Sequence, residues 1–94
     1  MSDTPERLRV FPDYCADGVW DDEGAVAPHE LPISDELAAR LTAWNRFWEE
    51  RRVDFSDWDS PESEKHFIGE GRAICDALTR ELPWNYTVVP AFEN

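Results

Sequence analysis

The 94-residue sequence has no apolar run long enough to span a membrane, which excludes a transmembrane helix. It also lacks an N-terminal basic region followed by an apolar core, so no signal peptide is predicted and the expected location is cytoplasmic. Cysteine is scarce, since Cys15 and Cys75 are the only two and no C-x-x-C pair exists to build a metal framework. In a reducing cytoplasm both are expected to be free thiols, with Cys75 in the core.

Positive charge is also scarce. The chain has 21 acidic and 9 basic residues, and thirteen of the acids lie in two stretches that contain no Lys or Arg. We call these stretches the first acidic segment, residues 10–39, and the second acidic segment, residues 53–64. Such a surface repels nucleic-acid phosphates and anionic membranes and attracts basic surfaces. The sequence therefore predicts no direct binding to nucleic acid or membranes, and a partner protein with a basic surface.

The clearest structural signal is an amphipathic helix predicted over residues 34–53. Large apolar side chains share one stripe of it, at i, i+4, i+7 and i+11: Leu37, Leu41, Trp44 and Trp48. Ala38, Phe47 and Val53 widen the stripe. Ser34 is the expected N-cap, because its hydroxyl can accept a hydrogen bond from a first-turn N–H.

A second helix is predicted over residues 61–82, with Ser60 as N-cap and Pro61 at its first position. Gly71 lies on its apolar stripe and leaves room for a bulky neighbour, which we expect to be a tryptophan of the first helix. Alternating apolar residues predict three strands, at 7–11, 19–20 and 84–91.

The stretches between these elements show no period. Residues 21–33 are predicted to form a connecting loop, and residues 54–60 a second loop with Phe55 and Trp58 as anchors to the core. A composition of 41% hydrophobic and 13% aromatic residues is typical of a globular chain. The sequence thus predicts a single α+β domain, residues 1–94, in the order β-β-α-α-β. Its two layers would be two antiparallel helices packed on one face of a small sheet of two to three strands.

Sites for chemistry are weakly indicated. Asp57, Asp59 and Glu62 offer three hard oxygen ligands in a short stretch, but they do not match an EF-hand loop. Cys15 as a nucleophile would be opposed by its acidic surroundings, which disfavour the thiolate. We therefore predict no catalytic residue, no metal and no cofactor, while a small divalent-metal-dependent module or enzyme stays open as an alternative.

The aromatic residues give the best indication of a binding surface. Trp44, Trp48, Phe67 and Trp84 are expected in the core. Two further tryptophans stand inside the acidic segments, and an aromatic within a charged rim is a common form of binding hot spot. The predicted partner-binding residues are accordingly Trp20, Asp21, Asp22, Glu23, Asp57, Trp58 and Asp59.

These residues favour a non-enzymatic protein-binding module, such as an immunity- or antitoxin-like inhibitor that engages the basic surface of a cationic enzyme. A nucleic-acid mimic that binds a DNA- or RNA-binding protein is another alternative. It would need carboxylates spaced like phosphates, whereas the arginines of the first predicted helix interrupt its negative charge. A homodimer also remains open.

One run of sequence is distinctive. It is PDYCADGVW at residues 12–20, followed by ISDELA at 33–38, Trp44, EGR at 70–72 and Val88. This pattern resembles a group of small acidic bacterial proteins to which no activity is assigned, over about residues 9–89. The resemblance implies a bacterial source and a stand-alone domain, and it carries no catalytic residues.

Overall fold

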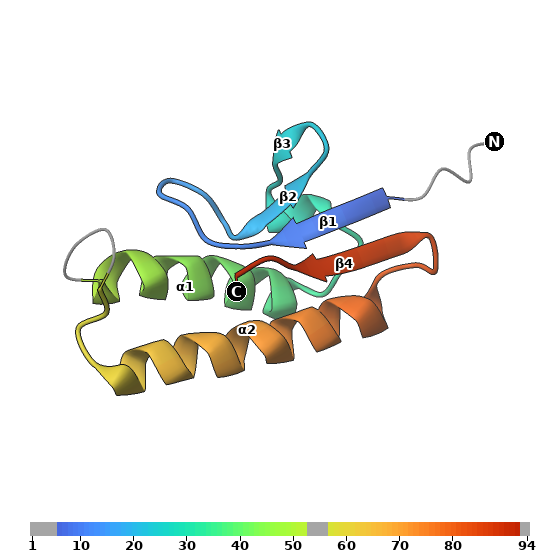
Figure 1. Ribbon diagram of the computed structural model, residues 1–94. Helices are drawn as coiled ribbons and strands as arrows, with labels where there is room; N and C mark the ends of the chain where they lie inside the picture. Colours follow the sequence, from blue (N-terminus) through green and yellow to red (C-terminus); the bar gives the residue numbers. More distant parts are fainter. Residues whose placement is uncertain (1–5, 53–56, 93–94) are drawn as a thin grey trace.

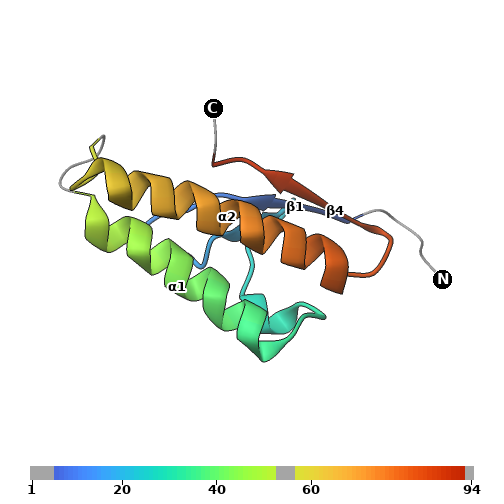
Figure 2. The ribbon, with the colours of Figure 1, turned by 90° about the horizontal axis from the view of Figure 1, so that it is seen from below.

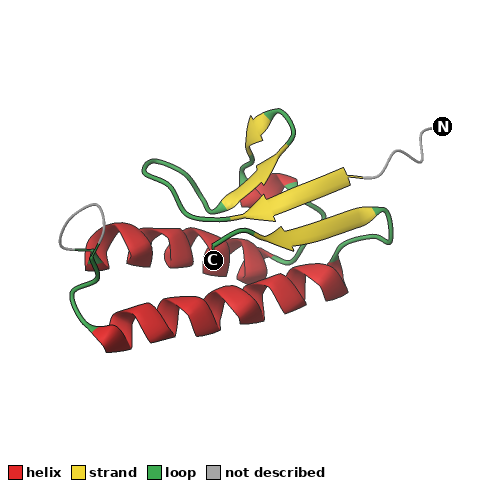
Figure 3. Cartoon of the chain, in the orientation of Figure 1, coloured by secondary structure: helices red, strands yellow, loops and turns green. Residues whose placement is uncertain are grey.

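The computed structural model describes residues 6–52 and 57–92. Its elements are β1 (Glu6–Val10), β2 (Val19–Asp21), β3 (Gly24–Ala25), the 3₁₀ helix η1 (Pro28–Glu30), α1 (Asp35–Arg51), α2 (Pro61–Glu81) and β4 (Tyr86–Pro90). Figures 1 and 3 show α1 and α2 running antiparallel on one face of the sheet. The predicted two-layer α+β fold is therefore confirmed.

The sheet is mixed and has the strand order β3-β2-β1-β4. β1 pairs antiparallel with β2 and parallel with β4, so Arg9 lies opposite both Trp20 and Val89. The prediction of two to three strands was wrong, because β3 and η1 lie in residues 21–33, which were expected to be a loop. β3 has only two residues, too few to show a period of two, and it forms by pairing with β2.

Both helices begin where the capping residues predict. The Ser34 hydroxyl accepts a hydrogen bond from Leu37 N–H at 3.2 Å, and Ser60 caps α2 in the same way. Of the residues assigned to the end of the first helix and the loop after it, Val53 and Phe55 lie outside the described residues. In the part of the chain that the structure describes, neither helix is long and apolar enough to cross a membrane.

The core lies between the sheet and the two helices. Figure 2 looks onto the helices and shows α1 and α2 side by side in front of β1 and β4. Trp44 of α1 stacks on Phe67 of α2 with ring centroids 4.5 Å apart, and its Nε1–H donates to the Phe67 carbonyl at 2.9 Å. Gly71 is buried beside this pair, as expected, because a Cβ placed there would lie 2.9 Å from a ring carbon of Trp44. The helix pairing inferred from the glycine is thus confirmed.

The helices are also linked across their exposed edge. The Arg40 guanidinium donates two hydrogen bonds to the Glu70 carboxylate, both at 3.1 Å. These hydrogen bonds raise the pKa of Arg40 above its ordinary value, against the opposing effect of burial. This bidentate pair adds orientation more than stability, because the side chains remain in contact with solvent.

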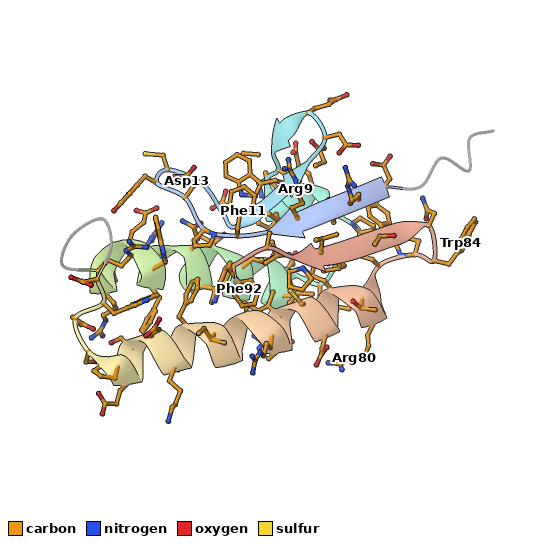
Figure 4. All side chains as sticks on the ribbon, viewed as in Figure 1. Arg9, Phe11, Asp13, Arg80, Trp84 and Phe92 are labelled. Atoms are coloured by element: carbon orange, nitrogen blue, oxygen red, sulfur yellow. The ribbon has the colours of Figure 1, made fainter. Side chains whose placement is uncertain are left out.

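Of the tryptophans assigned to the core, Trp84 lies elsewhere, and Trp48 packs against the core but is only partly buried. Trp84 is 82% exposed, in the turn between α2 and β4, and points away from the domain in Figure 4. The strand begins only at Tyr86, whose N–H donates to the Pro83 carbonyl and closes that turn. Trp48 is half-buried, at the rim of a surface hollow that is described below. For Trp84 the prediction failed because alternation alone cannot show where a strand starts.

Candidate functional site

The predicted acids of the first acidic segment form the turn between β2 and β3. The Asp21 carboxylate accepts hydrogen bonds from the backbone N–H groups of Glu23, at 2.7 Å, and Gly24, at 3.0 Å. It therefore closes the turn. Asp22 and Glu23 are exposed, and Asp22 forms an ion pair with Arg7 of β1 at 3.6 Å. The lack of bases in this stretch of sequence is thus partly compensated in space by β1.

Trp20 lies on the face of the sheet opposite the helices and contacts the residue that follows β1. Its ring stacks on Phe11 with centroids 4.7 Å apart and an interplanar angle of 4°. Its Nε1–H donates to the Phe11 carbonyl at 3.0 Å. The indole is half-buried. Trp20 and Phe11 therefore act as one aromatic unit, which the sequence separation of nine residues does not indicate.

Residues 57–64, the described part of the second acidic segment, lie where α2 begins, beside the end of α1. Trp58 is half-buried there, with its ring centroid 5.0 Å from that of Phe67, so it anchors its loop as predicted. Asp57 and Asp59 flank it and are exposed, and Asp59 forms an ion pair with Arg51 at 3.7 Å. This segment thus presents a tryptophan between two carboxylates.

A surface hollow of about 360 Å³ lies beside Trp58, and we call it the aromatic hollow. It lies between the residues after β1, the end of α1, the start of α2 and the residues after β4. The lining residues that matter below are Phe11, Trp48, Arg52, Trp58, Glu64 and Phe92. Figure 4 labels Phe11 and Phe92, which border it where the parallel strands β1 and β4 end, at the same end of the sheet. Phe11 thus contacts Trp20 and lines the same hollow as Trp58.

Trp48 packs against the core, as predicted, and it also lines this surface, which the sequence did not indicate. The Arg52 guanidinium lies over its ring, 4.9 Å from the centroid, and the exposed Tyr14 ring packs against it at 4.8 Å. Glu64 was not singled out either, although it lines both the aromatic hollow and a smaller one beside Asp57 and Asp59. The two hollows therefore share Trp58 and Glu64.

A hydrogen-bonded latch holds the β1–β2 loop beside the aromatic hollow. Asn45, which is only 1% exposed, accepts from Asp13 N–H at 3.1 Å and donates to the Asp13 carbonyl at 2.9 Å and to Glu49 at 3.0 Å. The Glu49 carboxylate in turn accepts from the backbone N–H of Cys15 at 3.2 Å. Asn45 was not predicted from sequence, and the only signal was an amide on the buried side of an amphipathic helix.

Chemistry other than binding has little support in this arrangement. Over residues 6–52 and 57–92, no group of three or more His, Cys, Asp or Glu side chains could hold a metal ion. Asp57, Asp59 and Glu62 therefore do not form the cluster that the metal alternative needs. Cys15 is exposed and adopts a φ of 60°, while Cys75 is buried as predicted.

A larger groove of about 760 Å³ runs along the outer side of α1, between that helix and η1. Small apolar side chains such as Ala39 and Ala43 form its floor, and its charged residues are of both signs. It contains none of the predicted partner-binding residues, whereas the aromatic hollow contains Trp58. The aromatic hollow is therefore the better candidate site.

Comparison with known protein families identifies the family of the chain. A family model for Serratia CdiI immunity protein-like proteins matches residues 6–91, which run from β1 to the residue after β4. The chain belongs to this Serratia CdiI immunity protein-like family. No curated protein matches it. Membership fits the role of a protein-binding inhibitor, the class that the acidic segments favoured, and it names no specific partner.

Proposed function

We propose that the protein is an immunity-type inhibitor that binds the basic surface of a toxin protein. The proposed binding face consists of the aromatic hollow and the exposed acids of the two acidic segments. The family match supports the inhibitor role, since an immunity protein acts by binding the toxin it neutralises. One geometric observation supports the choice of face: Phe11 stacks on Trp20 and lines the same hollow as Trp58. The residues proposed to contact the partner are Trp20, Asp22, Glu23, Asp57, Trp58 and Asp59.

The charge distribution supports an intact protein surface as the target rather than mimicry of nucleic acid. The formal net charge is −12, which favours approach to a cationic protein. Arg7 and Arg51, however, form ion pairs inside the two acidic regions. Among the residues that the structure describes, the acids therefore do not form an uninterrupted row of phosphate-like charges. The Asp21 carboxylate accepts the hydrogen bonds that close the β2–β3 turn. It therefore contributes negative charge to the surface but is not proposed as a direct contact with the partner.

The exposed acids of the proposed face should control the rate of association with the partner. We expect Asp22→Asn with Glu23→Gln, and separately Asp57→Asn with Asp59→Asn, to slow binding to the partner by about three- to tenfold at low salt. The dependence of the on-rate on salt should flatten in both variants, because fewer charges steer the encounter. Asp21 is left intact so that the turn persists. The measurement is binding kinetics at two salt concentrations, using the partner toxin recovered by pull-down from the native lysate.

Asp76→Asn is the control, because it removes an exposed acid of α2 from outside both acidic segments. Its on-rate should stay close to that of the parent. If the two double variants and this control associate equally fast, the acids serve only solubility and the proposed face is wrong.

The aromatic part of the face should control dissociation instead. We expect Trp20→Ala to raise the off-rate by about tenfold with little effect on the on-rate, because buried anchors act mainly on the lifetime of a complex. Trp84→Ala removes an equally large indole from the turn at the opposite end of the domain and should leave the off-rate unchanged. Circular dichroism checks that both variants are folded. Equal off-rates for the two variants would place the interface elsewhere.

A further inference from the structure

The sheet has two edges, and one of them is long enough to pair with a strand of another chain. β3 forms the first edge with only two residues, whereas β4 forms the other edge with five. Figure 3 shows β4 as the last strand of the sheet, with no described strand beyond it. An edge strand presents backbone groups to any extended chain that approaches, so the outer side of β4 is where a strand can add.

The hydrogen bonds between β1 and β4 show which backbone groups of β4 point outward. Ala91 N–H donates to the Val10 carbonyl at 2.9 Å, and the Asn85 carbonyl accepts from Glu6 N–H at the same distance. In a strand, the N–H and C=O of one residue point to the same side, and those of the next residue point to the other side. Residues 85, 87, 89 and 91 therefore face β1. The residues that face the open edge are Tyr86, Val88 and Pro90.

This outer edge is rich in hydrogen-bond acceptors and poor in donors. Each of the three residues offers a carbonyl. Pro90 has no N–H, and the Tyr86 N–H already donates to the Pro83 carbonyl at 3.1 Å. The Val88 N–H is thus the one donor of this edge that no other described residue engages. A strand that pairs here, in either direction, can donate to three carbonyls and accept from one N–H.

The shortage of donors selects against a second copy of this chain. Two β4 strands placed edge to edge would contribute one free N–H each, from Val88, so at most two hydrogen bonds could form in any register. A foreign segment with free N–H groups would form four. Proline is one of the residues that protect natural edge strands from self-association. Pro90 therefore disfavours pairing between copies while it leaves the three carbonyls open to a partner.

We propose that an extended segment of the toxin adds to the outer edge of β4 as a fifth strand of the sheet. This inference rests on the proposed function and specifies how the partner is held. The edge is continuous with the proposed face, because Ala91 and Phe92 follow β4 directly and line the aromatic hollow. Tyr86 and Val88 pack against the core and are half-buried, so the segment should carry apolar side chains at alternate positions on that side.

Pro90→Val tests the edge with this chain alone. The substitution adds a second outward N–H, so two copies could form four hydrogen bonds instead of two. We expect the variant to sediment with about twice the mass of the parent, because its edge is no longer protected. Thr87→Val is the control, since it introduces the same side chain into β4 without changing the donors of the edge, and it should sediment like the parent. If Pro90→Val also sediments like the parent, the edge does not pair with strands and the proposal is wrong.

Val88→Pro tests the edge in the complex with the toxin recovered by pull-down. It removes the one free donor, and because that N–H points away from β1, the pairing of β1 with β4 stays intact. Val88→Ala is the matched control, because it shortens the same side chain and keeps the N–H. We expect Val88→Pro to bind the toxin about five- to tenfold more weakly than Val88→Ala does. Equal affinities of the two variants, both shown to be folded by circular dichroism, would contradict the proposal.

Amide hydrogen exchange of the parent chain gives the same test without a substitution. The Val88 amide should exchange quickly in the free chain and about tenfold or more slowly in the complex. The amides of Thr87 and Val89, which face β1, should exchange slowly in both states. If the toxin binds and the Val88 amide exchanges as quickly as before, the inhibitor role stands and the strand addition is wrong. If the parent chain binds no toxin, the proposed function fails, and the partner assigned to this edge fails with it.

Discussion

Replacing Gly71 by leucine is expected to lower the free energy of unfolding by about 3 kcal/mol, the upper part of the range for overpacking a core. A Cβ at this position would lie 2.7 Å from the Phe92 ring and 2.9 Å from a ring carbon of Trp44. Phe92 can move aside, because it follows the last strand. Trp44 cannot, since it is stacked on Phe67 and hydrogen-bonded to its carbonyl.

The neighbouring glycine provides a matched control in the same helix. A Cβ on Gly69 would meet no atom within 4 Å, so Gly69→Ala should stabilise the protein by about 0.5–1 kcal/mol through helix propensity alone. Gly71→Ala has the same gain in propensity but also the contact with Trp44, and we expect a net loss of stability. Substitutions two residues apart therefore have opposite signs.

Urea denaturation of the three variants and the parent measures these differences. Near-ultraviolet circular dichroism reports in addition on the packing of the Trp44 ring. If Gly71→Leu unfolds at the same urea concentration as the parent, the close approach of α2 to Trp44 is wrong.

The position of Gly71 shows how much of the fold the sequence determines. A glycine on the apolar stripe of one helix and tryptophans on the stripe of the other predicted their contact, because helical period fixes which residues share a face. The same local signals predicted the two N-caps and the inward residues of β1. Each of these features depends on residues close together in the sequence.

The candidate site depends on residues that are far apart, and for this reason it was only partly predictable. Trp20 and Trp58 were selected as aromatic residues among acids, but their connection through Phe11 needs the pairing of β1 with β2. Trp48 packs against the core, as its helical spacing predicted, but that spacing does not show that part of its ring lines the aromatic hollow. Arg7 neutralises Asp22 only because β1 lies beside the β2–β3 turn.

Asn45 is the clearest residue that sequence did not predict, and Asn45→Ala should lower the free energy of unfolding by about 2 kcal/mol. The loss is large because the buried amide makes three hydrogen bonds, two of them to the backbone of Asp13. Thr42→Ala is the control, since it removes a single longer bond between α1 and the same loop, from Thr42 to Asp17 at 3.3 Å. It should cost about 0.5 kcal/mol.

Asn45→Asp then tests whether hydrogen bonding or volume is responsible. The introduced carboxylate has nearly the shape of the amide and can still accept from Asp13 N–H. It cannot donate to the Asp13 carbonyl, and it faces the Glu49 carboxylate that the amide now contacts at 3.0 Å. We therefore expect Asn45→Asp to be at least as destabilising as Asn45→Ala at neutral pH.

The pH dependence of this variant has a definite sign. Because the folded state disfavours the charged form of the introduced carboxylate, its pKa is higher in the folded than in the unfolded chain. The deficit relative to the parent is therefore full at neutral pH and shrinks as protonation removes the repulsion, below about pH 5. Urea midpoints of both proteins across this range measure it. If Asn45→Asp is as stable as the parent at pH 7, the amide fills space and does not hold the β1–β2 loop beside the aromatic hollow.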